Sequence, residues 1–297
     1  GVELRKLGFR KPILNLGGFF PETLPLFLQN EIIPSITDLP QLHALSQVKN
    51  QNFGVHIKLD LGMGRIGIQR HEVDALLTAL EKIPHAKVTG IFTHFPHTGN
   101  AAKEATPKHN SDFVEYANRI IERLQLSRAD VLLHAANSYS TIFFPETHHD
   151  MVRPGILFYG YYQSEEDRIE FNPRFGFRPS LELSAIPISI RRVPQGFGIS
   201  YSSLYVTKDA WENVGVLPLG YADGIPRALS NKIVFGMHPL LGRVTMDQII
   251  VGNATEPKAI RLLGEGVPSL ELWGKIAESF SYELMTHFGA RLRRELQ

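Results

Sequence analysis

The 297-residue chain contains no cysteine. Disulfides, thiol catalysis and cysteine-ligated metals are therefore excluded, and the composition fits a reducing cytoplasm, where we expect the protein. Neither sign of charge is in excess, because 31 lysines and arginines stand against 30 aspartates and glutamates. This balance offers no electrostatic argument for binding nucleic acid or a membrane surface. No apolar run approaches the ~18 residues of a membrane-spanning helix, so we also expect no membrane span.

The first part of the chain alternates strand-like and helix-like segments. Helical spacing of apolar residues occurs at 71–82 and 110–124, between apolar runs that predict strands at 12–16, 32–36, 55–59, 88–92, 131–134 and 155–159. This alternation predicts parallel strands with crossover helices. A (β/α)8 barrel fits best, because polar residues follow several strands and barrels carry their chemistry there. A doubly wound sheet is the alternative, but no glycine-rich strand-to-helix fingerprint supports it.

The number of strand candidates predicts an α/β barrel that is incomplete at its N-terminus. The barrel needs eight strand units and six are visible before residue 172, so about 60 residues would precede Gly1 at roughly 30 per unit. From Pro173 onward, short β-rich runs appear at 181–191, 213–217, 244–251 and 269–272, followed by a final helix at 282–294. We therefore expect a barrel domain over residues 1–172 and a mostly β domain over 173–297.

Among the polar segments, the first is HIKLDLGMGRIGI at residues 56–68. The alternation of a strand places His56, Lys58 and Asp60 on one face, toward the barrel interior. The glycines that follow allow a tight turn that leaves Arg65 at the rim. The alternative is a buried lysine–aspartate pair and a surface arginine, although a lysine facing an interior still needs neutralising, by a carboxylate or by modification.

Three further segments place polar groups beside predicted strands. His94 directly follows the strand in GIFTHF (90–95), and HAANS (134–138) closes another strand with Asn137 and Ser138. In DMVRPGI (150–156) the permanent cation of Arg153 lies beside backbone N–H groups, which suits a phosphate. The alternatives are a core histidine, a helix cap and a structural salt bridge.

The second domain contributes four loop segments: GISYS (198–202), LGYADGIPRALS (219–230), LGRVTMDQ (241–248) and SYE (281–283). Each alone is typical of ordinary loop or strand-end structure. Together with the segments of the first domain, and in this order from PILNLGG (12–18) onward, they resemble the alanine racemase family. The resemblance extends over nearly the whole chain.

This resemblance implies an isomerase of fold-type III that uses pyridoxal 5'-phosphate (PLP) and interconverts L- and D-alanine, supplying D-alanine for peptidoglycan. It implies a PLP-binding barrel, of TIM-barrel type, followed by a β domain. It also implies a head-to-tail homodimer, in which each active site combines one barrel with the partner's second domain. Tyr201 and Met246 would then act in trans. We expect no metal and no nucleic acid.

The resemblance also implies a set of cofactor contacts. Arg153 resembles the arginine that hydrogen-bonds the pyridine nitrogen. Arginine is a pure donor that does not surrender its proton, so that nitrogen would stay unprotonated and side reactions would be suppressed. The remaining implied cofactor groups are Asn137, Ser138, the backbone at Gly155 and Ile156, and Tyr282.

Racemisation needs an acid/base group on each face of the α-carbon. Tyr201 resembles the base that removes the α-proton from L-alanine, and His94, hydrogen-bonded in a chain with Arg153, resembles the group that tunes it. The other base of the family is a Schiff-base lysine in a Lys-x-x-x-Tyr-Gly segment, which this sequence does not contain. We expect that segment upstream of Gly1.

For the substrate, Arg65 resembles the arginine near the substrate carboxylate, and Met246 the residue whose backbone amide meets that carboxylate. Lys58 resembles the family's carbamylated lysine, which positions Arg65. The substrate access corridor would be lined by Tyr221, Arg227, Arg243 and Asp247. Departures from the family pattern include Ser202, where glycine is usual.

Three other functions are compatible with the sequence. A racemase of serine or of a wider set of amino acids would use the same residues. A non-catalytic PLP-binding or regulatory protein would apply if the lysine is truly absent. A structural or interaction module would make the polar strand ends coincidental.

Overall fold

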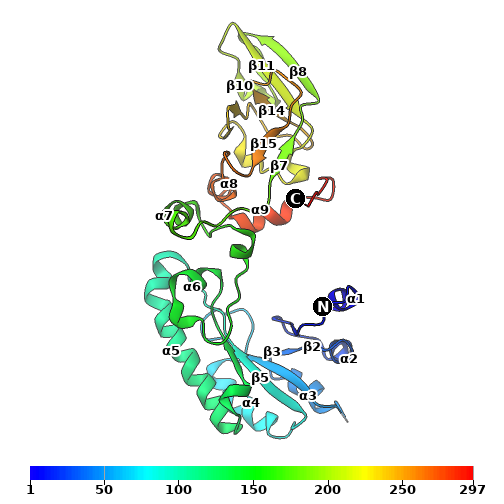
Figure 1. Cartoon of the computed structure of the whole chain (residues 1–297), viewed down its shortest axis with the longest axis vertical. Helices are drawn as coiled ribbons and strands as arrows, with labels where there is room; N and C mark the ends of the chain where they lie inside the picture. Colours follow the sequence, from blue (N-terminus) through cyan, green and yellow to red (C-terminus); the bar gives the residue numbers. More distant parts are fainter. Residues whose placement is uncertain (50, 297) are drawn as a thin grey trace. The chain divides into compact units, whose positions relative to one another are not determined.

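The structure of the chain is a computed structural model that describes residues 1–49 and 51–296. It divides into two compact units, Gly1–Pro154 and Gly155–Gln297, each described by itself below (Figure 1). The division falls ahead of the domain boundary expected between residues 172 and 173, which lies within helix α7 (Glu165–Phe175).

Unit 1 is built on parallel strands, as the alternation predicted. One sheet has the order β3-β4-β5-β6, formed by Ser35–Ile36, Phe53–Lys58, Ala86–Phe92 and Leu132–His134. A parallel pair of short strands joins β1 (Ile13–Leu14) to β2 (Ile32–Ile33). The helices of unit 1 are α1 (Val2–Lys6), α2 (Leu24–Gln29), α3 (Gln41–Ser46), α4 (Val73–Leu80), α5 (Gly99–Arg123) and α6 (Ser138–Phe143).

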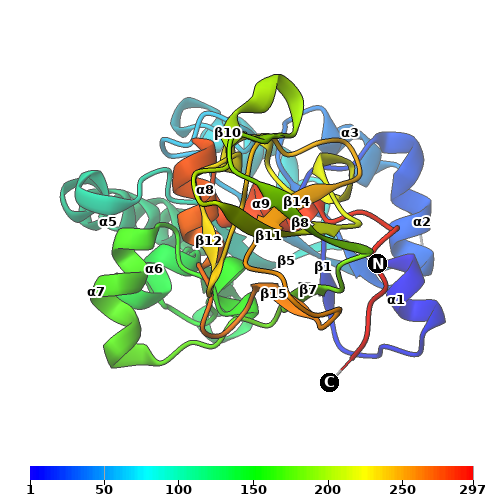
Figure 2. The ribbon, with the colours of Figure 1, turned by 90° about the horizontal axis from the view of Figure 1, so that it is seen from above.

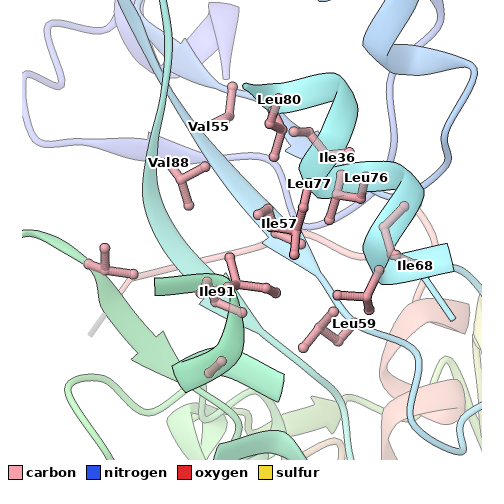
Figure 3. Close-up of a cluster of buried hydrophobic side chains, with 14 of the residues drawn as sticks. Ile36, Val55, Ile57, Leu59, Ile68, Leu76, Leu77, Leu80, Val88 and Ile91 are labelled. Atoms are coloured by element: carbon pink, nitrogen blue, oxygen red, sulfur yellow. The ribbon is translucent and has the colours of Figure 1, made fainter. Parts of the chain in front are cut away.

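Helix α4 covers one face of β4. Figure 3 shows Leu76, Leu77 and Leu80 of α4 pointing toward side chains of β4 such as Ile57, all of them buried. Helical spacing brings the leucines to one stripe, and the alternation of a strand sends every second residue of β4 toward them. His56 and Lys58 therefore lie on the other face of the strand, which leaves them free for the site described below.

Unit 2 is mostly β. Its largest sheet is antiparallel in the order β14-β11-β8, formed by Ile249–Gly252, Trp211–Leu217 and Ser189–Pro194 (Figure 2). Three smaller antiparallel pairs join β15 (Ile260–Leu263) to β7 (Leu183–Ala185), β10 (Tyr205–Val206) to β9 (Gly198–Ile199), and β12 (Val234–Phe235) to β13 (His238–Pro239). The run at 181–191 thus supplies two strands of different sheets.

Two of the expected strands were wrong. Residues 155–159 form a 3₁₀ helix, Ile156–Tyr159, which ends at Gly160 in the left-handed region. Residues 269–272 begin helix α8 (Leu270–Ala277), because the Ser269 side chain caps it by accepting a hydrogen bond from the Leu272 backbone.

The final helix is shorter than expected. Helix α9 (Ser281–His287) ends at Phe288, and the backbone then turns at residues 290–291 instead of continuing as a helix to Arg294. Within this turn, Arg291 forms an ion pair at 3.0 Å with the buried carboxylate of Asp223. None of the helices that the structure describes is both long and apolar enough to cross a bilayer.

Candidate active site

The carboxyl ends of three neighbouring strands gather polar side chains in unit 1. The parallel register aligns Lys58 of β4 with Phe92 of β5, and Phe92 with His134 of β6. Thr93 and His94 follow directly on β5. Parallel strands end at one edge of a sheet, so these groups meet there, as the barrel interpretation predicted.

Arg153 lies beside this edge and is held by neutral acceptors. Its backbone N–H donates to the Ala136 carbonyl, which sets the segment alongside the continuation of β6. Its guanidinium donates to His134 Nδ1 at 2.6 Å and to the carbonyls of Thr93 and Ala135 at 2.6 and 3.1 Å. Burial lowers the pKa of Arg153 to about 10, so the group stays a cation at neutral pH.

No carboxylate pairs with this cation within residues 1–49 and 51–296. The alternative of a structural salt bridge at Arg153 is therefore wrong. An unneutralised cation that is largely buried is costly unless something else compensates it. The edge is thus suited to an electron-rich or anionic ligand.

Lys58 adds a second positively charged side chain, itself buried, to the same edge. It is 3% exposed, and its Nζ lies 5.9 Å from the centre of the Phe92 ring. Burial, and then the charge of Arg65, lowers the pKa of Lys58 to about 8. The expected lysine–aspartate pair is wrong, because the described structure forms no ion pair between Lys58 and Asp60. Lys58 is consequently a partly neutral amine near pH 8.

Asp60 instead organises the loop that carries Arg65. Its carboxylate accepts backbone hydrogen bonds from Gly62 at 3.2 Å, Gly64 at 2.9 Å and Arg65 at 2.9 Å. Burial alone would raise the pKa of Asp60, but these bonds outweigh it and lower the pKa below its usual value. The Gly64 backbone has φ +66, in the left-handed region that favours glycine. Arg65 is exposed at the rim, as its sequence predicted.

His94 is half-buried near the cations, but it is not the histidine that bonds to Arg153. Burial, and then the charges of Arg153, Arg65 and Lys58, lowers the pKa of His94 to about 4, so its ring is neutral. The expected hydrogen-bond chain from His94 to Arg153 is wrong in this structure. His134 takes that place, because the register brings its ring within 2.6 Å of the guanidinium.

Asn137 and Ser138 begin helix α6. The Asn137 side chain caps the helix by accepting a hydrogen bond from the Ser140 backbone at 3.0 Å, and its amide group donates to the Phe95 carbonyl at 3.3 Å. Ser138 is the first residue of the helix. The helix-cap alternative is confirmed for Asn137, and it places Ser138 where backbone N–H groups point out of the helix.

In unit 2, Gly155 and Tyr282 approach each other closely. A Cβ atom at Gly155 would lie 1.8 Å from the Tyr282 hydroxyl oxygen, so only glycine allows this approach. Ile156 opens the 3₁₀ helix that follows Gly155. Burial raises the pKa of Tyr282, which keeps its hydroxyl protonated and able to donate. These groups form a donor-lined corner.

The other sites expected in unit 2 lie on loops that are joined to one another. The Ser200 hydroxyl, next to Tyr201, donates to the Arg243 carbonyl at 2.9 Å. The Tyr221 backbone donates to Thr245, and that of Ala222 to the carbonyl of Met246, both at 2.9 Å. The loop cluster therefore brings together Tyr201, Tyr221, Arg227, Arg243, Met246 and Asp247, all exposed except the half-buried Arg243.

Both halves of the chain match one family. Residues 1–163 match the alanine racemase N-terminal domain and residues 180–296 the alanine racemase C-terminal domain. The chain belongs to the alanine racemase family. It is 33% identical to the alanine racemase of Halothermothrix orenii, over 99% of this chain and 80% of that protein. It is also 33% identical to that of Carboxydothermus hydrogenoformans, over 99% of this chain and 82% of that protein.

Solved alanine racemases share the fold. The structure from Clostridium difficile 630 superposes with a TM-score of 0.84 at 29% identity, covering 98% of this chain and 77% of that one. The Bacillus anthracis alanine racemase, solved with bound L-Ala-P, gives 0.83 at 29% identity, covering 97% and 76%. The α/β barrel domain followed by a mostly β domain is therefore confirmed as the fold class.

Sequence reasoning missed all three partners of the Arg153 guanidinium. His134 was noted only as the start of a polar segment, and the carbonyls of Thr93 and Ala135 were not considered. The available signal was the position of His134 at the very end of a strand. What made it a partner is the register of β6 against β5, which pairs residues about 40 positions apart in the chain.

The groups of each unit, taken separately, suit PLP, the cofactor of the alanine racemase family. Arg153 offers a guanidinium that no described carboxylate engages, which suits a ring nitrogen that accepts a hydrogen bond. The missing Cβ of Gly155 lets the Tyr282 hydroxyl lie against the backbone at this corner. Protonated hydroxyl and backbone N–H donors suit a phosphate.

Proposed function

We propose that this protein is an alanine racemase, which interconverts L- and D-alanine with PLP and supplies D-alanine for peptidoglycan. The observation that carries the proposal is the environment of Arg153, a largely buried cation bonded only to an imidazole and two carbonyls among the described residues. Membership of the alanine racemase family supports it.

In this proposal Arg153 donates to the pyridine nitrogen of the cofactor. Its fixed charge and lack of an acceptor keep that nitrogen unprotonated. Ser138, the backbone at Gly155 and Ile156, and Tyr282 hold the cofactor at its phosphate end, and Asn137 is a further cofactor contact. PLP, when bound, stabilises negative charge at the α-carbon of an amino acid.

Tyr201 removes and returns the α-proton on one face. It projects from an exposed loop, with 71% of its surface accessible, and the family resemblance assigns it to the active site of the partner in a head-to-tail homodimer. A phenol that acts as a base needs a nearby cation to hold its deprotonated form. The cations around His94 supply that field, and His94 stays neutral beside them.

The substrate carboxylate is bound by Arg65 and by the Met246 backbone amide. Lys58, as a carbamate, would add the anion that orients Arg65, and its low pKa supports this because only the neutral amine forms a carbamate. Tyr221, Arg227, Arg243 and Asp247 line the access corridor.

The test is racemisation by the full-length protein loaded with PLP. L-Alanine is supplied, D-alanine is followed with a D-amino-acid oxidase, and L-serine is run in parallel. We expect alanine to turn over faster than serine. Tyr201→Phe should lower kcat at least about 100-fold, since positioned acid/base groups contribute that much. The matched control is Tyr116→Phe on α5, which should leave kcat unchanged.

Two outcomes would contradict the proposal. A protein that binds PLP but racemises neither amino acid would be a non-catalytic PLP-binding protein. A kcat/KM for L-serine above that for L-alanine would identify a serine racemase.

A further inference from the structure

Behind Arg153 lies a second buried histidine, His56 on β4, which no role described so far includes. His56 Nδ1 lies 3.0 Å from His134 Nε2, and His134 Nδ1 lies 2.6 Å from an Arg153 nitrogen. His56 is 3% exposed and His134 is fully buried. The three side chains therefore form one continuous hydrogen-bonded chain that leads from the sheet interior to the site.

The direction of every bond in this chain follows from Arg153. A guanidinium can only donate, so His134 Nδ1 must accept and carries no proton. A neutral His134 then holds its proton on Nε2 and donates it to His56 Nδ1, which accepts in turn. His56 is thereby fixed with its own proton on Nε2. One charged donor sets two tautomers.

Both rings stay neutral across the working range of an enzyme. Burial, and then the charge of Arg153, lowers the pKa of His56 to about 4. The same two causes, followed by the neighbouring His56, lower the pKa of His134 to about 2. Protonation of either ring would place two donors face to face, so the chain cannot tolerate it.

The packing around the rings leaves them little freedom. A Cβ atom at Gly90, the strand partner of His56, would lie 2.3 Å from His56 Cε1 and 2.4 Å from Nδ1. The His134 ring stacks on Phe92 with centroids 4.8 Å apart and an interplanar angle of 7°. Rotation of either ring would therefore need movement of the sheet itself.

We propose that His56 is a positioning residue, which acts through His134 to fix the Arg153 guanidinium in the orientation that it presents to the cofactor. This inference rests on the proposed function, because the orientation of Arg153 matters only where a ligand nitrogen accepts its proton. Gly90 belongs to the same device, since it makes room for the His56 ring.

Three variants separate the hydrogen bond from the volume of the ring. His56→Asn keeps an acceptor where Nδ1 lies, His56→Leu keeps similar bulk without an acceptor, and Gly90→Ala displaces the ring without removing it. Each is prepared as the full-length, PLP-loaded protein. Urea unfolding shows whether each variant folds.

The first readout is the tautomer of each ring, measured by long-range ¹H–¹⁵N correlation on histidine-labelled protein. We expect His56 and His134 both to carry the proton on Nε2, unchanged from about pH 6 to about pH 8. His134 should keep this tautomer in His56→Asn. In His56→Leu and Gly90→Ala the His134 Nε2–H loses its buried acceptor, which should displace the ring from Arg153 and, once that bond is broken, allow a mixture of tautomers.

The second readout is kinetic. Loss of one buried hydrogen bond in the chain should lower kcat about tenfold in His56→Leu and Gly90→Ala with little change in KM for alanine. His56→Asn should stay within about threefold of the unaltered enzyme. A purely structural role would lower stability without this split between kcat and KM and without rescue by asparagine.

The inference is overturned if His134 carries its proton on Nδ1, or if His56→Leu leaves both the His134 tautomer and kcat unchanged. Failure of the proposed function looks different. A protein without racemase activity whose histidines still show the expected tautomers would reject the function and the positioning role, while the hydrogen-bonded chain itself would remain established.

Discussion

Removal of the Asp60 carboxylate should weaken substrate binding by releasing the loop that carries Arg65. Three backbone N–H groups donate to this carboxylate, two of them at 2.9 Å. Charge-assisted bonds of this kind contribute roughly 1 kcal/mol or more each, but the loop is exposed and water replaces part of the loss. Asp60→Ala should therefore lower the free energy of unfolding by about 2 kcal/mol. Asp60→Asn, which keeps one acceptor, should lose about half as much.

The same change should raise KM for alanine about tenfold, because Arg65 loses its fixed position, with a smaller effect on kcat. Asp74→Ala is the matched control. Asp74 forms an exposed ion pair with Arg119, and such pairs contribute about 0–1 kcal/mol. The control should leave KM unchanged.

The pH dependence gives a sharper test. The pKa of Asp60 is lowered in the folded protein, so its stabilisation is present above the unfolded pKa near ~3.9 and is lost as the pH falls through the folded pKa. The stability difference between the unaltered protein and Asp60→Asn should thus be full at about pH 7 and shrink below about pH 4.

The assay for this prediction is urea unfolding followed by far-UV circular dichroism. Both tryptophans, Trp211 and Trp273, lie in unit 2, so their fluorescence reports that unit and serves as an internal reference. If Asp60→Ala changes stability by less than about 0.5 kcal/mol and KM by less than about twofold, the carboxylate does not hold the loop as argued.

Three further changes have expected outcomes. Gly155→Ala should weaken PLP affinity more than about tenfold, because its Cβ would collide with the Tyr282 hydroxyl. The control Gly17→Ala, whose Cβ meets only ordinary contacts, should bind PLP normally. Equal affinities of the two variants in a PLP titration would contradict this prediction. Lys58, with its pKa at about 8, should form more carbamate as the pH rises from about 7 to about 9, because more of the amine is then neutral. The carbamate is measured as a ¹³C signal in the presence of labelled carbonate, and Lys58→Ala should lack it. A signal that persists in Lys58→Ala would contradict this prediction. Ser202→Gly should stabilise unit 2 by roughly 0.5 kcal/mol, because φ +59 costs a serine about 1 kcal/mol and the freer unfolded chain offsets about half; destabilisation in the fluorescence-detected urea transition would refute the strain.

The sequence predicted elements well where one periodicity was strong. Strand β4 follows the period of two, so the assignment of His56 and Lys58 to one face was sound, and Ile57 on the opposite face is buried in the core. The strand predicted at 155–159 was wrong because an apolar run of this length fits a strand or a 3₁₀ helix equally. The strand predicted at 269–272 was wrong because Ser269 caps a helix there, a role that was not considered.

The site was predictable as a set of residue types but not as a network. The family resemblance supplied Arg153 and a nearby histidine, and the strand-end rule supplied the place where they meet. The resemblance named His94 as the histidine bonded to Arg153, whereas the structure has His134, because the choice depends on how β5 and β6 are aligned, and that alignment is set by packing across the whole sheet.

The charge of the acceptors around Arg153 matters more than their number. A carboxylate in place of His134 would bond equally well to the guanidinium, but it would cancel the charge, and the ligand would then meet a neutral pair. Imidazole and carbonyl groups satisfy the donors while leaving the full positive charge directed at the site. His134 can play this part only as an uncharged acceptor, and His56 is the residue that accepts the hydrogen bond from its second nitrogen. The specificity of the site for a ligand that accepts a hydrogen bond therefore depends on residues that do not contact the ligand. Gly90 leaves room for the His56 ring, and His56 acts on Arg153 through His134.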